Sequence, residues 1–304
     1  RARLPAGAGG QSGHAKWLAI RLAPLMYWHP ACVCHVTEVA EMTSYDVLSE
    51  VYEWLIADAK LDPAEFAAAF DDVLSLLPPN PRVLDCSCGT GQLAVGLAAR
   101  GIEVVATDAS EGMVRRTAAL SEKHGTTVRT VRASWEELRH HGESEAFDMV
   151  FCVGNSLHHA VGAQGRAAAL ESMALLLCRG GRLVLTSRTW ERVRARGSRL
   201  EVRERLVRRH GRDAVVIYRW EIAPRWEDEH RIEIAIAQLD AAGAVSVRSE
   251  LLSCWPYRYD ELEDDRGVQL PRALDLVTAA CGRRRSGTAA GWSGRRGCRG
   301  RGSG

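Results

Sequence analysis

Two hydrophobic periodicities alternate along the middle of the chain. Short apolar runs, typical of buried strands, are followed by stretches with an apolar residue every three or four positions, typical of amphipathic helices. The predicted strands are Arg82–Asp85, Ile102–Thr107, 126–132, Phe147–Val153 and Arg182–Ser187. The predicted helices cover residues 63–77, 91–100, 111–123 and 164–177. Because strands and helices alternate, we expect an α/β fold with a doubly wound, mostly parallel sheet and helices on both faces.

Turn and cap residues mark the ends of these elements. Asp62 precedes Pro63, an arrangement typical of a helix N-terminus, and Pro78-Pro79 ends that helix. Gly101 follows the second helix, where glycine commonly forms a C-cap. Ser110 stands just before the third helix, where its hydroxyl can cap the first turn. These signals support the same alternation of strands and helices.

The pattern changes after residue 190. Three segments alternate apolar and polar residues and predict antiparallel strands, namely Ala214–Ile222, His230–Leu239 and Ala244–Leu252. We expect a small antiparallel β cap inserted late in the fold, with the third strand a candidate to return to the main sheet. The arginine-rich run 192–209 also contains Glu201 and Glu204, a mixture that favours a solvated helix with ion pairs over a nucleic-acid contact.

The two ends of the chain differ from this middle part. Residues 1–41 show no sustained periodicity and no secretory signal pattern, so we expect a non-native or disordered extension. Residues 281–304 contain eight glycines and seven arginines, which favours a disordered tail, with an RNA-binding tail as the alternative. The predicted parts are the extension at 1–41, an α/β domain at 42–190, a cap and substrate region with a return to the sheet at 191–262, and an irregular or disordered tail at 263–304.

Charge and cysteine usage limit the expected partners. The 304 residues carry a formal net charge of +2, but residues 42–275 hold 29 basic and 36 acidic side chains. This part lacks the basic footprint of a nucleic-acid-binding domain, and no apolar stretch is long enough to predict a membrane span. The nine cysteines form no CxxC pair, so we expect no metal site and reduced thiols in a cytoplasmic protein. The expected partner is a small molecule, and a homo-oligomer is compatible with this pattern.

The strongest chemical signal is VLDCSCGTG at residues 83–91. An apolar strand runs into Asp85, and a turn through Gly89 and Gly91 leads into a helix. Glycine is needed where a backbone turns tightly and a ligand packs directly on it. Asp108 ends the next strand, where a carboxylate can accept hydrogen bonds from both hydroxyls of an adenosine ribose.

Two classes of cofactor fit this loop. Gly89, Gly91 and Ala94 satisfy the G-x-G-x-x-G/A dinucleotide pattern, which is weak evidence when it stands alone. Asp85 favours the other class, because its carboxylate would repel a pyrophosphate at the helix N-terminus. The same carboxylate suits a cationic group, such as the α-ammonium of S-adenosylmethionine.

Four segments resemble class I S-adenosylmethionine-dependent methyltransferases: 83–91, the strand end at Asp108, FDMVFCVGNS at 147–156 and CRGGRLVL at 178–185. The resemblance spans roughly residues 43–262 and is closest to the glycine and glycine/sarcosine N-methyltransferase group. It implies a Rossmann-like methyltransferase fold with S-adenosyl-L-methionine as the cofactor of the domain at 42–190.

The resemblance also implies site residues. An early Tyr-x8-Trp pair matches Tyr45 and Trp54, and a pair that frames the adenine matches Ser134-Trp135. The full set of implied cofactor contacts is Tyr45, Trp54, Asp85, Ser87, Gly89, Gly91, Asp108, Ser134, Trp135 and Val153.

The implied catalytic residues are Asn155, His159 and Arg188. Asn155 follows the fourth strand, where the transferred methyl group is expected, and His159 is a candidate to accept a proton from the acceptor amine. Arg188 matches an arginine that holds the substrate carboxylate. The structural alternatives are a surface position for the histidine and an ion pair between Arg188 and Glu191.

Two departures from the group stand out. A cap-strand tyrosine that the glycine enzymes use near the substrate falls on Ile236, and Ala273–Thr278 supplies at most one of the two strands expected at the end of the fold. The resemblance implies methyl transfer to a small acceptor with an amine and a carboxylate. The alternatives are an O- or C-methyltransferase of a small secondary metabolite and a non-catalytic, methyltransferase-like binding domain.

Overall fold

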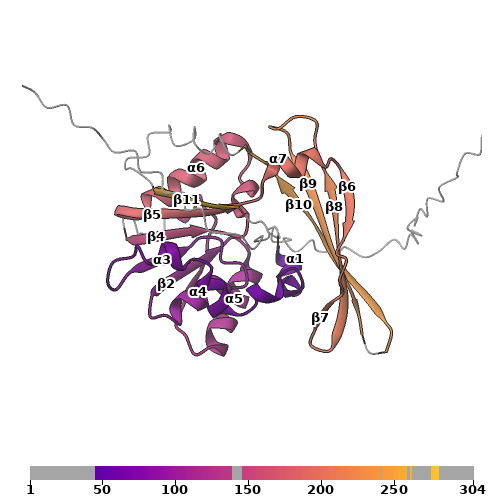
Figure 1. The fold of residues 1–304 in the computed structure, drawn as a ribbon, viewed down its shortest axis with the longest axis horizontal. Helices are drawn as coiled ribbons and strands as arrows, with labels where there is room; N and C mark the ends of the chain where they lie inside the picture. Colours follow the sequence, from indigo (N-terminus) through magenta and orange to yellow (C-terminus); the bar gives the residue numbers. More distant parts are fainter. Residues whose placement is uncertain (1–44, 139–145, 241, 259–260, 262–274, 281–304) are drawn as a thin grey trace, which may run out of the picture. The chain divides into compact units, whose positions relative to one another are not determined.

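The computed structural model describes residues 45–138, 146–240, 242–258, 261 and 275–280. All of these belong to the second of the two units into which the chain divides, Met42–Gly304. Within it the described strands form two separate sheets, one parallel and one antiparallel (Figure 1). The predicted termini at 1–41 and 281–304 lie outside the described residues.

The parallel sheet confirms the predicted doubly wound fold. Its strand order is β11-β5-β4-β1-β2-β3, and all pairings between these strands are parallel. The strands are β1 (Arg82–Asp85), β2 (Glu103–Asp108), β3 (Arg129–Arg132), β4 (Phe147–Cys152), β5 (Leu177–Ser187) and β11 (Asp275–Ala280). The order reverses at β1, which pairs with β2 on one side and β4 on the other. A ligand crevice is expected beyond the carboxyl ends of these strands, at that switch point.

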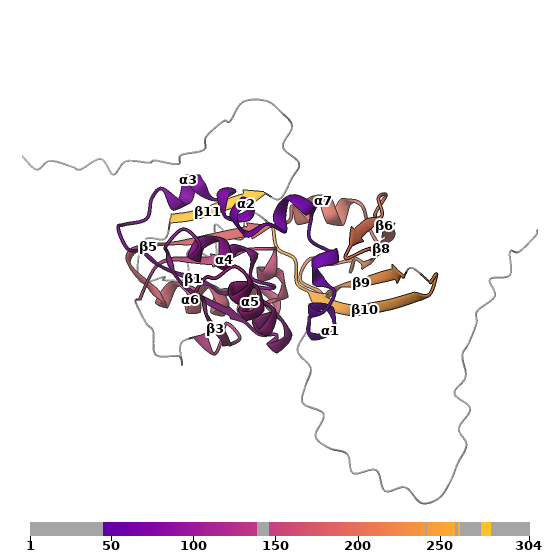
Figure 2. The same ribbon diagram turned by 90° about the horizontal axis from the view of Figure 1, so that it is seen from below.

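The alternation of side chains along β1 separates two cores. Val83 packs with buried residues of α2 (Pro63–Ala68) and α4 (Gln92–Ala98) on one face of the sheet. Leu84 faces the opposite core, which includes buried residues of α6 (Gly162–Leu175). Helices therefore cover both faces, as Figures 1 and 2 show, because successive residues of a strand point to opposite sides.

Of the helices predicted in the α/β part, one has the predicted bounds and another is divided in two. The helix α5 (Glu111–Lys123) has the predicted bounds and is capped by the Ser110 hydroxyl, which accepts from the Met113 N–H. The segment predicted as one helix over 63–77 is instead α2 followed by α3 (Asp71–Leu74). Phe70 leaves the helical conformation between them, and its ring packs edge-on against Phe151 at 5.3 Å between centroids. Burial of this ring takes precedence over continuation of the helix.

The antiparallel cap contains the three predicted strands and two more. The predicted strands are β8 (Arg212–Glu221), β9 (His230–Leu239) and β10 (Val245–Cys254). β10 pairs with β9 over its whole length, so the expected return of the third strand to the main sheet is wrong. Strand β6 (Arg199–Val202) lies at the other edge, and β7 (Val207–Arg209) pairs with one end of β8.

The solvated helix predicted over 192–209 is also wrong. Only α7 (Trp190–Ala195) is helical, and Gly197 then adopts a left-handed conformation (φ 64°) that leads into β6. The expected ion pairs are present nevertheless, since Glu201 contacts both Arg196 and Arg199.

Part of the segment predicted to be irregular, 263–304, forms a strand. Residues 275–280 lie within the segment expected to be irregular, yet they form β11, which pairs in parallel with β5. The single late strand expected near Ala273–Thr278 is therefore present, shifted by two residues. No helix among the described residues is long and apolar enough to cross a membrane.

Candidate functional site

The loop after β1 forms a close-packed turn around a buried carboxylate. Asp85 is 1% exposed, and the Ser87 N–H points toward its Oδ1 at a long 3.5 Å. Gly89 and Gly91 both have positive φ. A Cβ at Gly91 would meet the Thr117 side chain at 2.8 Å, so only glycine fits where the loop packs on α5.

Burial gives Asp85 an unusual ionisation. Removal of the carboxyl group from water raises its pKa to about 7, and the nearby Asp108 contributes to the rise while the Ser87 N–H opposes it. The charged form has no cationic partner among the described residues. A positive group at this position would stabilise the carboxylate.

Asp108 ties the loop to the end of β2. One carboxylate oxygen accepts from the Gly89 N–H and the other from the Ser110 N–H, both at 3.0 Å. Burial raises the pKa of Asp108, and the two N–H donors oppose that rise. Each oxygen keeps a second lone pair, so the side chain is fixed in orientation and can still accept further hydrogen bonds.

Trp135 is fixed beside the start of the same loop. Its indole Nε1 donates to the Cys86 carbonyl at 2.9 Å, and its half-buried ring packs against the core that contains Leu84. The preceding Ser134 has its N–H bound to the Glu137 carboxylate at 2.7 Å. The structure therefore places Trp135 next to the loop at 85–91, with its ring held by both polar and apolar contacts, whereas the contact of Ser134 is with Glu137.

The turn after β4 is joined to that loop by a shared carbonyl. The Val153 carbonyl accepts from the Ser87 hydroxyl at 3.2 Å and from the Ser156 hydroxyl at 2.8 Å. Gly154 and Asn155 both have positive φ, and the buried Asn155 Oδ1 has no hydrogen-bond partner in the structure. A buried amide oxygen without a donor is costly unless a ligand supplies one.

His159 connects this turn to the N-terminal segment and to the cap. Its Nδ1 lies 2.9 Å from the Ser253 carbonyl of β10, and its Nε2 lies 2.9 Å from the Tyr45 hydroxyl. Burial lowers the pKa of His159 to about 4, so the ring is neutral at neutral pH. Because a carbonyl can only accept, Nδ1 carries the proton and Nε2 accepts from the Tyr45 hydroxyl.

Arg188 follows β5 and lies among these groups. Its guanidinium carbon sits over the Trp220 ring at 5.4 Å from the centroid, and its buried Nε has no hydrogen-bond partner. Burial raises the pKa of Tyr45 and of Tyr52, and the positive charge of Arg188 is close enough to oppose both shifts. Within the described ranges Arg188 forms no ion pair, and the alternative pair with Glu191 is not seen there.

Comparison with known proteins identifies the fold and its domain. A family described as "Methyltransferase domain" matches residues 83–181, from β1 into β5. The glycine/sarcosine N-methyltransferase of Parasynechococcus marenigrum (strain WH8102) is 35% identical over 118 residues, which are 38% of this chain and 41% of that protein. The chain contains a class I S-adenosylmethionine-dependent methyltransferase domain.

Solved structures agree with this methyltransferase fold. The CcbJ methyltransferase from Streptomyces caelestis has a TM-score of 0.60 at 21% identity, covering 75% of this chain and 87% of that one. The S-adenosylmethionine-bound CalS10, an amino pentose methyltransferase from Micromonospora echinaspora, has a TM-score of 0.56 at 22% identity, covering 74% and 88%. The match to the glycine/sarcosine enzyme, by contrast, spans less than half of that protein.

Tyr52, which the sequence analysis did not single out, borders the loop at 85–91. A Cβ built at Gly89 would lie 3.9 Å from Cε1 of Tyr52, so this ring borders the loop. Asp108 also acts on the pKa of Tyr52, which burial raises to about 12. Tyr52 stands two residues before Trp54, inside the segment that the early aromatic pair had marked, and this was the available signal.

Trp54 and Ile236 are both buried in the apolar cluster of the cap. Trp54 is 2% exposed and belongs to a buried cluster that also contains Ile236 and other cap residues. Ile236 is fully buried in that cluster, so the cap strand presents an apolar side chain at the position where the glycine enzymes are expected to have a tyrosine. The cofactor role of Trp54 stays a prediction.

Proposed function

We propose that this chain transfers a methyl group from S-adenosylmethionine to the amine nitrogen of a small acceptor that also carries a carboxylate. The observation that carries the acceptor class is Arg188, a guanidinium without an ion pair among the described residues, at the carboxyl end of β5. A buried or half-buried arginine is costly unless an anion meets it, and its planar fork suits a carboxylate. The likeness to glycine/sarcosine N-methyltransferases supports the same acceptor class.

The cofactor would lie across the loop at 85–91. Asp85 suits its α-ammonium, because that cation would stabilise the charged form of a carboxyl group whose pKa burial raises to about 7. Asp108 has free lone pairs for the ribose hydroxyls, and Trp135 offers a fixed ring beside the loop for the adenine. The Gly89–Gly91 turn and the unpartnered Asn155 oxygen provide the close-packed backbone and the polar groups that such a ligand needs.

The chain's own residues would act mainly by holding the reactants in line. S-adenosylmethionine, when bound, would supply a methyl group on a sulfonium; a neutral acceptor amine would displace the sulfur, which would keep the electron pair of the C–S bond, and the resulting ammonium would lose a proton to water. The Tyr45 hydroxyl donates a hydrogen bond to Nε2 of His159, which leaves the lone pairs of its oxygen to accept from the amine N–H. A pKa of about 4 makes His159 a weak base at neutral pH, so we assign it to orienting Tyr45.

A panel of matched acceptors tests this proposal. The full chain is incubated with cofactor carrying a labelled methyl group and with glycine, sarcosine, methylamine or acetate. We expect label in glycine or sarcosine, at least tenfold lower kcat/KM with methylamine, which lacks the carboxylate, and no transfer to acetate, which lacks the amine. Transfer only to phenols or other hydroxyl acceptors would overturn the N-methyltransferase proposal. Cofactor binding without turnover on a broad panel would favour a non-catalytic binding domain.

A further inference from the structure

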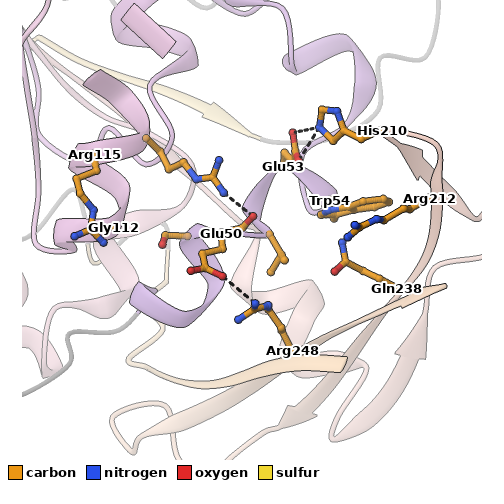
Figure 3. Close-up of a pocket in the computed structure, with 12 residues that line it drawn as sticks. Glu50, Glu53, Trp54, Gly112, Arg115, His210, Arg212, Gln238 and Arg248 are labelled. Carbon is orange, nitrogen blue, oxygen red and sulfur yellow. Dashed lines mark hydrogen bonds and ion pairs between the residues drawn. The ribbon is translucent and has the colours of Figure 1, made fainter. Parts of the chain in front are cut away.

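One pocket of the described structure has no residue of the loop at 85–91 in its lining. It has a volume of about 580 Å³ and is lined by the segment from Ser49 to Trp54, by α5, and by the cap from His210 to Arg248 (Figure 3). None of the residues assigned to the cofactor or acceptor lines it, except Trp54. Its volume falls within the range of about 300–1,000 Å³ that is typical of small-molecule sites.

The charges in this pocket are unbalanced. Its lining contains four arginines and two glutamates, together with His210. Both glutamates already have partners, since Glu50 pairs with Arg248 at 3.0 Å and Glu53 contacts His210 at 3.0 Å. The Glu50 carbonyl also accepts from Arg116 at 2.7 Å. The acids of the pocket are therefore already occupied by these partners.

Two of the arginines have no such partner. The guanidinium groups of Arg115 in α5 and of Arg212 at the start of β8 form no ion pair and no hydrogen bond with any described residue. Figure 3 shows them on opposite sides of Glu50, with Arg212 beside Trp54 and Gln238. The amide of Gln238 adds a neutral donor on the same side. A ligand that meets both arginines must therefore carry anionic groups at two separate points.

The local charge is opposite to that of the domain around it. Residues 42–275 carry more acidic than basic side chains, so general attraction of anions by the domain does not explain this pocket. Guanidinium groups bind phosphate and carboxylate oxygens through paired N–H donors, and nearby like charges are relieved when an anion binds between them. We propose that this arginine pocket binds a small polyanion with two or more phosphate or carboxylate groups.

Calorimetry on the full chain at low salt tests the proposal with two probes, tripolyphosphate and citrate. We expect at least one of them to bind, and the stronger one shows whether phosphate or carboxylate is preferred. The double variant Arg115→Ala/Arg212→Ala should weaken that binding at least tenfold. The control Arg179→Ala/Arg192→Ala removes the same charge from exposed positions outside the pocket and should change the affinity less than twofold.

Saturating S-adenosylhomocysteine separates this site from the cofactor crevice. Binding of the polyanion should persist within twofold in its presence, because the two sites share none of the loop residues. The proposal is overturned if neither probe binds, if both double variants lose affinity equally, or if S-adenosylhomocysteine abolishes polyanion binding. Melting temperatures of the two double variants, compared with that of the original chain, verify that each is folded. These outcomes are independent of whether the chain transfers methyl groups.

Discussion

The Tyr45 hydroxyl lies 2.9 Å from Nε2 of His159, and the opposite ring nitrogen of that histidine lies 2.9 Å from the Ser253 carbonyl. Three distant parts of the chain thus meet at one imidazole: the N-terminal segment, the turn after β4 and the last strand of the cap. The carbonyl fixes the tautomer, and the tautomer fixes the direction of the Tyr45 proton. A cap strand therefore helps to orient a hydroxyl beside the turn after β4.

This relationship predicts coupled effects at Tyr45 and His159. Tyr45→Phe and His159→Leu should each lower kcat/KM for the acceptor by about three- to tenfold, the value of one hydrogen bond of 0.5–1.5 kcal/mol. If His159 acts only by orienting Tyr45, kcat/KM of the double variant should be no lower than that of the less active single variant. Steady-state kinetics measures this, with His124→Leu at the exposed end of α5 as control. Multiplied losses in the double variant would contradict the coupling.

The ionisation of Asp85 predicts pH-dependent cofactor binding. Its pKa is about 7, and in the proposed site the α-ammonium of the ligand pairs with the charged form of this carboxylate. Affinity for S-adenosylhomocysteine should therefore fall as pH decreases below 7, by roughly tenfold between pH 7 and pH 5.5, where an α-amino group stays protonated. Calorimetry across this range measures the change. Asp85→Asn should bind weakly with a much flatter profile, and an equally steep profile in that variant would assign the titration to another group.

The raised pKa of Asp85 also predicts that the cofactor-free protein becomes less stable as pH rises, whereas its affinity for the cofactor increases. The folded-state pKa of Asp85 is raised above its ordinary value of 3.8, so the cofactor-free protein loses stability as pH rises from about 4 to 7. The full cost is on the order of 4 kcal/mol. At pH 8 the melting temperature of cofactor-free Asp85→Asn should exceed that of the original chain by several degrees, and at pH 5 the difference should shrink. An Asp85→Asn variant that melts earlier at pH 8 would show that the charged form has a stabilising partner.

Asp108 is predicted to hold the ribose. Asp108→Ala should weaken S-adenosylhomocysteine binding by roughly ten- to 150-fold, since a hydrogen bond to a charged group contributes about 1.5–3 kcal/mol. Asp108 also accepts from Gly89 and Ser110, so Asp108→Asn, which keeps one acceptor oxygen, should lose less. Asp72→Ala, an exposed residue of α3, is the matched control. Unchanged affinity in Asp108→Ala would remove this residue from the site.

Elements whose strand, turn or cap residues are neighbours in the sequence could be predicted from the sequence alone. The run from Val83 to Gly91 carries its own strand, turn and helix start, and α5 has a capping serine and an amphipathic pattern, so both were predictable. Asp85 and Asp108 could be placed together because each ends a strand of a parallel sheet, and such ends meet at one edge.

The elements that were missed depend on tertiary contacts. The break at Phe70 follows from its packing against Phe151, more than eighty residues away, which periodicity cannot show. The charged residues of β6 and β7 are equally compatible with an exposed helix, and only pairing with β8 makes them strands. The contact of Tyr52 with the loop and that of His159 with Ser253 likewise join segments far apart in the chain.

The central claim is that Arg188 binds the carboxylate of an amine acceptor, and one comparison tests it most directly. It measures kcat/KM for glycine or sarcosine, whichever is turned over, and for the carboxylate-free methylamine, in the original chain and in Arg188→Lys. Arg192→Lys on the exposed side of α7 is the control. The account predicts that Arg188→Lys loses tenfold or more on the carboxylated acceptor, from a contact of roughly 1.5–3 kcal/mol, while its methylamine rate and cofactor affinity stay within twofold. Equal losses on both acceptors, or an unchanged rate on the carboxylated one, would contradict it.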